Sequence, residues 1–357
     1  MKIDKILLVA CILVIGFASC KKEDDDDGTV EFEENDRTEQ QEIDSDSLIG
    51  YLETHYYNAS DFVSNTNPSA LDVVITEVLE GETPPDGSVR LIDELITTDN
   101  PDGKLESYNV VYEDTDYEYY VLRLNQGAGE NSPTFADDIY VRYEGSTLDN
   151  DVFETILNID GGAVALSSPT SNFIKGWRLV LPQFNVASSF TDNGDGTVEY
   201  LDHGAGVMFL PSGLGYFSTY INGDQYAPLI FKFDIVGMNE NDHDGDGIPS
   251  YMEDLDGDGE FTTNFDDLED ETDDDTDGDG FANYIDADDD GDGVLTIYED
   301  ADGDGDPTND KSDPDNTDLP DYLNPDISES NQEDWDIFGC KKKRKEPYFA
   351  ALFFFVL

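Results

Sequence analysis

The sequence predicts an α+β fold, in which an antiparallel sheet wraps around a short helix, followed by an acidic segment of irregular structure. Three observations predict it. Apolar residues alternate at Ile139, Val141 and Tyr143 and again from Leu229 to Ile235, which is the pattern of half-buried strands. A short apolar stretch that suits a helix, 175–181, lies between these two strands. From residue 240 onward, alternate Asp residues with neighbouring Gly replace the apolar pattern.

The charge of the chain limits what it can bind. Its 357 residues carry 18 basic and 84 acidic side chains, which gives a formal net charge of −66. Such a chain repels the phosphates of nucleic acids and anionic lipid surfaces, and its natural partners are cations. An apolar content of 38%, with 19 Tyr and 20 Phe, is nevertheless enough for a folded core. The acidic residues must therefore be concentrated in one part of the chain.

The N-terminus has the features of a lipoprotein signal peptide. Lys2 and Lys5 precede an apolar stretch, 6–17, that is too short to cross a bilayer and suits a signal peptide. Residues 17–20, Phe-Ala-Ser-Cys, resemble a bacterial lipobox, in which Cys20 would carry the lipid. An ordinary cleaved signal with an incidental Cys is the alternative.

The signal peptide is predicted at 1–20, and the residues that follow it indicate the cellular location of the protein. Two lysines precede an acidic run, 23–27, which resembles the surface-export tether of some Gram-negative lipoproteins; a plain solvated linker is the alternative. We expect an outer-membrane lipoprotein held to the membrane by lipid at Cys20, exposed at the cell surface or otherwise facing the periplasm. Because Cys11 leaves with the signal peptide and only Cys340 remains as a thiol, no intrachain disulfide is possible.

Two regions precede the strongest apolar pattern. Residues 21–46 are acidic and polar and indicate a linker, whereas residues 47–117 indicate an accessory α+β region to which no chemical task can be assigned. An apolar stripe over 48–56 predicts a helix of about three turns, on which His55 packs as an aromatic side chain rather than serving as a ligand. Strands are predicted at 71–79, 88–96, 108–112 and 117–124.

Five short motifs in residues 118–239 stand in the order of a known family. They are Val-Arg-Tyr-Glu-Gly at 141–145, Val-Phe-Glu at 152–154, Phe-Ile-Lys-Gly-Trp at 173–177, Pro-Ser-Gly-Leu-Gly-Tyr at 211–216 and Leu-Ile-Phe at 229–231. In this order they resemble the FKBP-type peptidyl-prolyl cis-trans isomerases. The resemblance implies an isomerase domain whose sheet wraps around the short helix and whose hydrophobic pocket receives proline-containing polypeptides. It implies no cofactor for catalysis.

The resemblance also implies which side chains form the pocket. Trp177 would form its floor, and Glu154 stands where the family usually has Asp. The implied site residues are Tyr143, Phe153, Glu154, Phe173, Ile174, Trp177, Tyr216 and Phe231. Their types suit the reaction, because rotation about an X-Pro bond loses amide resonance over a barrier of roughly 18–20 kcal/mol. A dry aromatic pocket disfavours the polar planar amide relative to the twisted one, and no nucleophile is needed.

The sequence departs from the family pattern at several positions. Glu154 is one methylene longer than the usual Asp, Phe217 replaces a common Gly, and 163–166 lacks the aromatic residue expected there. A long excursion with a hairpin turn at 193–196 is inserted as well. An alternative function therefore stays open, a non-catalytic surface module that binds a proline-containing segment and uses the acidic repeats for calcium-dependent adhesion or assembly.

The acidic residues are concentrated in residues 240–326. From residue 241 to 326 there are 34 acidic side chains against one Lys, a net of −33, which is half of the charge of the whole chain. Five loops begin with Asp at positions 1, 3 and 5 and Gly at position 6, the spacing that supplies oxygen ligands to Ca²⁺ in EF-type loops. The candidate ligands are Asp242, Asp244, Asp246 and Glu253; Asp254, Asp256 and Asp258; Asp275, Asp277, Asp279 and Asp286; Asp288, Asp290, Asp292 and Glu299; and Asp300, Asp302 and Asp304.

The spacing of these loops excludes paired EF-hands. The loops start 12, 21, 13 and 12 residues apart, which leaves no room for long flanking helices. The block instead resembles thrombospondin type-3-like calcium repeats, which implies structural Ca²⁺ bound weakly, at ~10⁻⁴–10⁻³ M by analogy with extracellular modules. A solvated acidic spacer is the alternative. We expect His203 and His243 to face solvent, because hard Ca²⁺ prefers oxygen.

The C-terminal residues 327–357 have a different composition. A basic run, 341–345, precedes a Phe-rich end, 348–357, that is too short to span a membrane. We expect a disordered tail; contact with an anionic membrane is the alternative.

Overall fold

The computed structural model describes residues 34–79, 81–159, 164–166, 173–268, 270, 272–328 and 330–331. The expected signal peptide, the acylated Cys20 and most of the expected tail lie outside these residues. Within them, no helix is both long and apolar enough to cross a bilayer.

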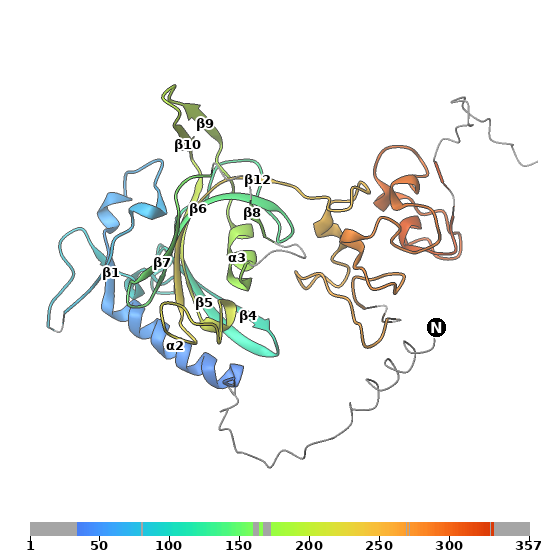
Figure 1. The fold of residues 1–357 in the computed structure, drawn as a ribbon. Helices are drawn as coiled ribbons and strands as arrows, with labels where there is room; N and C mark the ends of the chain where they lie inside the picture. Colours follow the sequence, from blue (N-terminus) through green and yellow to red (C-terminus); the bar gives the residue numbers. More distant parts are fainter. Residues whose placement is uncertain are drawn as a thin grey trace, which may run out of the picture. The chain divides into compact units, whose positions relative to one another are not determined.

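The described chain before residue 240 combines twelve strands with two α-helices (Figure 1). The helices are α2 (Arg37–Thr54) and α3 (Lys175–Val180). The strands are β1 (His55–Tyr57), β2 (Ile75–Glu77), β3 (Val89–Arg90), β4 (Leu105–Tyr112), β5 (Thr115–Asn125), β6 (Asp138–Thr147), β7 (Val152–Ile156), β8 (Val164–Ala165), β9 (Ser189–Asp192), β10 (Val198–Leu201), β11 (Gly204–Leu210) and β12 (Leu229–Asn239).

Seven strands of the described residues form the main antiparallel sheet. Their order is β4-β5-β11-β12-β6-β7, and β8 pairs with the start of β6. The register between β12 and β6 sets Phe233 opposite Tyr143 and Phe231 opposite Gly145. Two of the five sequence motifs are therefore neighbours in the sheet, and the predicted α+β organisation is confirmed.

Both faces of this sheet are buried. Successive side chains of a strand point to opposite faces, and on β12 Phe231 and Phe233 pack with α3 whereas Ile230 packs with α2. The α3 face also receives Met208 of β11, and the opposite face receives Phe209. Figure 1 shows α2 and α3 on opposite sides of the sheet.

Two smaller elements flank the main sheet. A three-stranded sheet of order β2-β1-β3 follows α2, and β9 and β10 pair as a separate hairpin. The turn of this hairpin falls at 193–196, where the Asn193 N–H donates to the carbonyl of Thr197 at 3.0 Å. The hairpin turn predicted from the sequence is thus present.

The N-terminal helix is longer than the sequence predicts. α2 begins at Arg37, so part of the expected linker 21–46 is helical; the Asp36 side chain accepts a hydrogen bond from the Glu39 N–H and caps the helix. The apolar pattern at 48–56 does not extend over the first turns of α2, because the buried side chains of those turns are polar, among them Gln40 and Asp44. The boundary of the accessory region also differs, because β4 and β5 are strands of the main sheet.

A buried carboxylate joins the accessory region to the main sheet. Asp234 of β12 is fully buried, accepts from the Ala70 N–H at 2.7 Å and lies 3.0 Å from the guanidinium of Arg142. His203 is also buried, with Nε2 3.5 Å from the other oxygen of Asp234. The expectation that His203 faces solvent is therefore wrong, because its ring is buried with Nδ1 3.3 Å from the Tyr200 carbonyl oxygen.

A second buried carboxylate, Asp44, fixes α2 against the turn at 212–214. Its Oδ2 accepts from the Ser212 N–H at 2.7 Å and from the Ser212 hydroxyl at 2.6 Å. Burial raises the pKa of Asp44, and the hydrogen bonds from Ser212 and Gln40 oppose that shift.

We expect Asp44→Ala to lower the free energy of unfolding by about 1–3 kcal/mol, because it leaves the Ser212 donors buried without an acceptor. Urea denaturation measures this loss. Asp46→Ala, an exposed position on the same helix, is the matched control and should change stability little. Equal effects of the two substitutions would contradict the assigned role of Asp44.

The acidic segment contains only short turns of helix. In the described part of 240–326 the regular elements are five 3₁₀ helices, at Ser250–Glu253, Asn283–Ile285, Thr296–Tyr298, Pro307–Asn309 and Asp321–Leu323. The chain remains ordered slightly beyond the expected boundary at 327, because Asn331 donates hydrogen bonds to the carbonyls of Tyr298 and Asp300.

Candidate functional site: an aromatic cluster and five acidic loops

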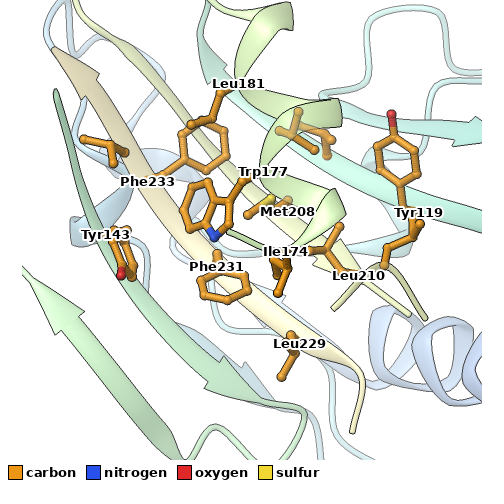
Figure 2. Packing of buried hydrophobic residues seen from close by; sticks show 14 of the residues in the cluster. Tyr119, Tyr143, Ile174, Trp177, Leu181, Met208, Leu210, Leu229, Phe231 and Phe233 are labelled. Atoms are coloured by element: carbon orange, nitrogen blue, oxygen red, sulfur yellow. The ribbon is translucent and has the colours of Figure 1, made fainter. Parts of the chain in front are cut away.

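Aromatic side chains from three motifs meet at Trp177. Its ring centroid lies 4.9 Å from that of Phe231, 5.1 Å from Tyr143 and 5.9 Å from Phe173. Figure 2 shows Trp177 on α3 facing Phe231, with Tyr143 and Ile174 beside them. The remaining two rings join through Phe231, because Phe153 lies 5.6 Å from it and 6.4 Å from Tyr216.

The cluster has a buried base and a half-buried edge. Tyr143, Ile174, Trp177 and Phe231 are buried, whereas Phe153, Phe173 and Tyr216 are partly exposed. All the aromatic and aliphatic residues that the sequence assigns to the pocket are thus in one cluster, called the aromatic cluster below. Phe233 also contacts Trp177 at 6.0 Å. Phe233 is not among the site residues predicted from the sequence, although it stands in the same alternating strand as Phe231.

Two glycines permit this close packing. A Cβ added to Gly145 would lie 2.7 Å from the ring of Phe231 and 2.8 Å from that of Phe153. A Cβ on Gly176 would lie 2.3 Å from Leu210. The glycines of two sequence motifs are therefore required by the packing of their neighbours.

Glu154 places a carboxylate beside the tyrosines of the cluster. Burial raises the pKa of Tyr143, and the hydrogen bond between its hydroxyl and the Glu154 carboxylate raises it further. Burial likewise raises the pKa of Tyr216, to which the negative charge of Glu154 contributes. Glu154 itself is exposed. Both phenols consequently stay protonated at neutral pH and can donate hydrogen bonds.

The helix that carries Trp177 also presents two cations to the acidic segment. The Lys175 ammonium lies 2.6 Å from the Glu260 carboxylate, and the Arg178 guanidinium pairs with the other oxygen of Glu260. A cavity of about 430 Å³ adjoins these side chains and is lined by α3 residues and by the loop 254–259. Neither basic residue is among the site residues predicted from the sequence.

The five acidic loops share one backbone geometry. In each loop the carboxylate at position 1 accepts from the N–H of the Gly at position 6, as Asp242 does from Gly247 at 3.2 Å and Asp275 from Gly280 at 2.9 Å. The carboxylate at position 3 accepts from the N–H at position 5 in all five loops. The Gly at position 6 has a positive φ in each, +101° at Gly247, which explains its recurrence.

The loops bring carboxylates together in five clusters. In each cluster one ligand oxygen per residue lies within 4.8 Å of the others, a separation that suits a shared metal ion. The clusters are Asp244, Asp246, Glu253 and Asp289; Asp254, Asp256 and Asp258; Asp275, Asp277 and Asp279; Asp288, Asp290 and Asp292; and Asp300, Asp302 and Asp310.

These clusters differ in detail from the ligands expected from the sequence. Asp242, Asp286, Glu299 and Asp304 lie outside them, and Asp289 and Asp310 take part instead. In the fifth loop, position 12 is Lys311, which cannot be a ligand, and the neighbouring Asp310 joins the cluster instead. No sequence signal distinguishes Asp289, because it stands within a run of Asp between positions 1 and 3 of the fourth loop.

Several carboxylates of the loops are buried without a positive partner among the described residues. Burial, together with neighbouring carboxylates, raises the pKa of Glu253 to about 10, that of Asp289 to about 10 and that of Glu299 to about 9. Such groups fit a divalent cation, which supplies the missing charge. His243 is not a free solvent-facing side chain as expected, since its Nδ1 lies 2.8 Å from the Ser250 hydroxyl and its ring meets Tyr284 edge-on.

Comparison with known proteins gives partial matches. A family model described as BamM C-terminal matches residues 243–299, which is less than half of the chain and falls on the acidic loops. No curated protein matches.

Solved structures match over 34% of this chain. A peptidyl-prolyl cis-trans isomerase from Pseudomonas syringae has 17% identity, a TM-score of 0.26 and 76% of its own chain covered. FkpA from Escherichia coli has 18% identity and a TM-score of 0.26, and the three FKBP domains of wheat FKBP73 have 12% and 0.27. The match spans about half the length of these two, 48% and 47%.

Proposed function

We propose that the chain is a peptidyl-prolyl cis-trans isomerase that rotates X-Pro bonds in secreted or surface polypeptides. The observation that carries the proposal is the convergence of Tyr143, Phe153, Trp177, Tyr216 and Phe231 in one cluster, since these rings come from separate motifs. Aromatic residues that only filled separate parts of the core would have no reason to follow the order of the five motifs.

The half-buried edge of the aromatic cluster is where a prolyl ring would pack. Phe153, Phe173 and Tyr216 offer apolar surface there, with Trp177 behind them. An apolar surface favours the less polar twisted amide over the planar one, and the Tyr216 hydroxyl can donate to a carbonyl that flanks the proline. The protein supplies binding and orientation, and no proton needs to move.

The acidic loops would bind structural Ca²⁺ and keep the segment compact. The convergence of carboxylate oxygens in five clusters, the Gly turn at position 6 and the buried carboxylates without cationic partners support this assignment. Without a cation, like charges at these distances repel one another. Glu260 then links the segment to Lys175 and Arg178 on the helix that bears Trp177.

We place the protein at the outer membrane, held by lipid on Cys20 and exposed at the surface or facing the periplasm. The Phe-Ala-Ser-Cys sequence at 17–20 and the preceding apolar stretch support this. Protease shaving of intact cells distinguishes the two faces, and mass spectrometry of the N-terminal peptide detects the lipid.

An isomerase assay on an X-Pro peptide tests the proposed activity. We expect Phe153→Ala and Tyr216→Ala to lower kcat/KM more than tenfold, because each removes apolar surface where the ring would pack. Phe190→Ala, on the exposed hairpin β9–β10, is the control and should keep full activity. A wild-type rate equal to the uncatalysed rate would contradict the proposal.

The alternative is a non-catalytic surface module that binds a proline-containing segment. The exposed Glu154 in place of Asp and the strand Val164–Ala165, which carries no aromatic residue, favour it. Binding of the peptide without acceleration of its isomerisation would establish this alternative. Repeating the assay with EDTA shows whether the acidic loops affect the site.

A further inference from the structure

One carboxylate cluster is built from two loops that are distant in sequence. Asp244, Asp246 and Glu253 belong to the first acidic loop, whereas Asp289 belongs to the fourth. The four ligand oxygens lie within 4.8 Å of one another. We call these four residues the bridging cluster.

The bridging cluster is the most deeply buried of the five. Asp246 is 1% exposed, Glu253 0% and Asp289 1%. Neither oxygen of Glu253 and neither oxygen of Asp289 has a hydrogen-bond partner among the described residues. A buried polar group without a partner is costly, and a buried unpaired charge more so. These unpartnered carboxylates point to a bound cation.

The size of the cluster fits a single calcium ion. Ca²⁺ holds its oxygen ligands at about 2.3–2.6 Å, so oxygens on opposite sides of one ion lie about 4.6–5.2 Å apart. The separation in the bridging cluster, at most 4.8 Å, therefore suits one shared ion rather than two. Six to eight oxygens are required in all, and the bidentate mode open to Glu253 contributes to that number.

The geometry of the fourth loop turns Asp289 away from its own cluster. Asp288, Asp290 and Asp292 at positions 1, 3 and 5 converge on that cluster, and the intervening Asp289 joins the first loop instead. The Asp289 N–H donates to the Thr296 hydroxyl at 3.3 Å, which fixes its backbone within the fourth loop. A side chain anchored in one loop thus completes the ligand set of another.

We propose that a single calcium ion joins the first and fourth acidic loops through Asp289, and so closes the chain that contains the second and third loops. This rests on the proposed binding of calcium by the acidic loops. The bridging ion differs from an ion held within one loop, because its ligand set exists only when both loops are in place. Binding at this cluster is therefore coupled to the ordering of the intervening chain, 254–288.

Calcium stoichiometry and hydrogen exchange of the full mature chain test the bridge. Asp289→Asn keeps the shape of the side chain and removes the charged ligand. Asp315→Asn makes the same change at an exposed residue outside the five clusters and is the matched control. By calorimetry we expect wild type and Asp315→Asn to bind equal numbers of ions, and Asp289→Asn to bind one fewer. With calcium present, amide exchange in Asp289→Asn should increase in both 242–253 and 288–299.

Glu253→Gln provides the reciprocal test. It changes only the first loop, yet we expect faster exchange in residues 288–299, because the fourth loop loses its link as well. Unchanged stoichiometry in Asp289→Asn, or an effect of Glu253→Gln confined to 242–253, would overturn the bridge while leaving calcium binding by the loops intact. Wild-type protein that takes up no calcium would remove the proposed function of the loops and the bridge together.

Discussion

Calcium affinity of the acidic loops is expected to fall by about tenfold per pH unit, for each proton displaced, as the pH is lowered from 7.5 to 5.5. Calcium must displace protons from Glu253 and Asp289 of the bridging cluster, whose pKa values are raised to about 10. Calorimetric titration at several pH values measures the slope.

The sign of the effect follows from the direction of these shifts. A carboxyl whose folded pKa lies above its unfolded value stabilises the metal-free fold most below the unfolded pKa, at about pH 4. That contribution is lost as the pH rises toward the folded pKa, about 10 for Glu253. The metal-free segment should therefore become less stable between pH 4 and 10, and the stabilisation that calcium adds should grow over the same range.

Two variants distinguish proton release by these buried carboxyls from a general effect of the charge of the chain. Glu253→Gln should reduce the number of protons released per calcium by about one, because it removes one titrating ligand. Asp315→Asn, which is exposed, should leave the slope unchanged. An affinity that does not change with pH would show that calcium does not displace protons from these buried carboxyls.

Replacement of Trp177 by Ala should lower the free energy of unfolding by about 3–5 kcal/mol, which is the usual cost of removing a buried aromatic side chain. Trp177 is 3% exposed and meets the rings of Tyr143, Phe173, Phe231 and Phe233. Urea denaturation in excess calcium measures the change, since the acidic segment is then in a constant state.

Phe190→Ala is the matched control for this experiment. Phe190 is also aromatic but is 67% exposed on β9, so its loss should change stability by no more than about 0.5 kcal/mol. If the two substitutions cost the same, Trp177 does not hold the aromatic cluster together. Activity assays complement the stability data, because the half-buried Phe153 and Tyr216 can be replaced at lower structural cost.

The aromatic cluster could be predicted from the sequence because its residues lie in ordered motifs. The register of the sheet then brings these motifs together, because β12 pairs with β6 and places Phe231 beside Gly145 and Phe233 beside Tyr143. The acidic loops could also be predicted from the sequence, because the spacing of Asp and Gly residues specifies their local geometry.

The features that the sequence could not predict depend on contacts between distant residues. The first turns of α2 bury polar side chains such as Asp44, whose partner Ser212 is far along the chain. His203 is buried near Asp234, which lies on β12, another strand of the sheet. Asp289 is one acid within a run of similar acids, and only the packing of two loops shows which cluster it joins.

The two buried faces of the sheet have a practical consequence for anyone dividing this chain into fragments. A piece cut at residue 118 would strip α2 and β4 from the sheet and expose Tyr120, Phe209 and Ile230 to water. It would also leave β5 as a bare edge, which invites pairing with other copies. Recombinant expression, domain transplantation and library design should therefore keep Asp36 as the N-terminal limit.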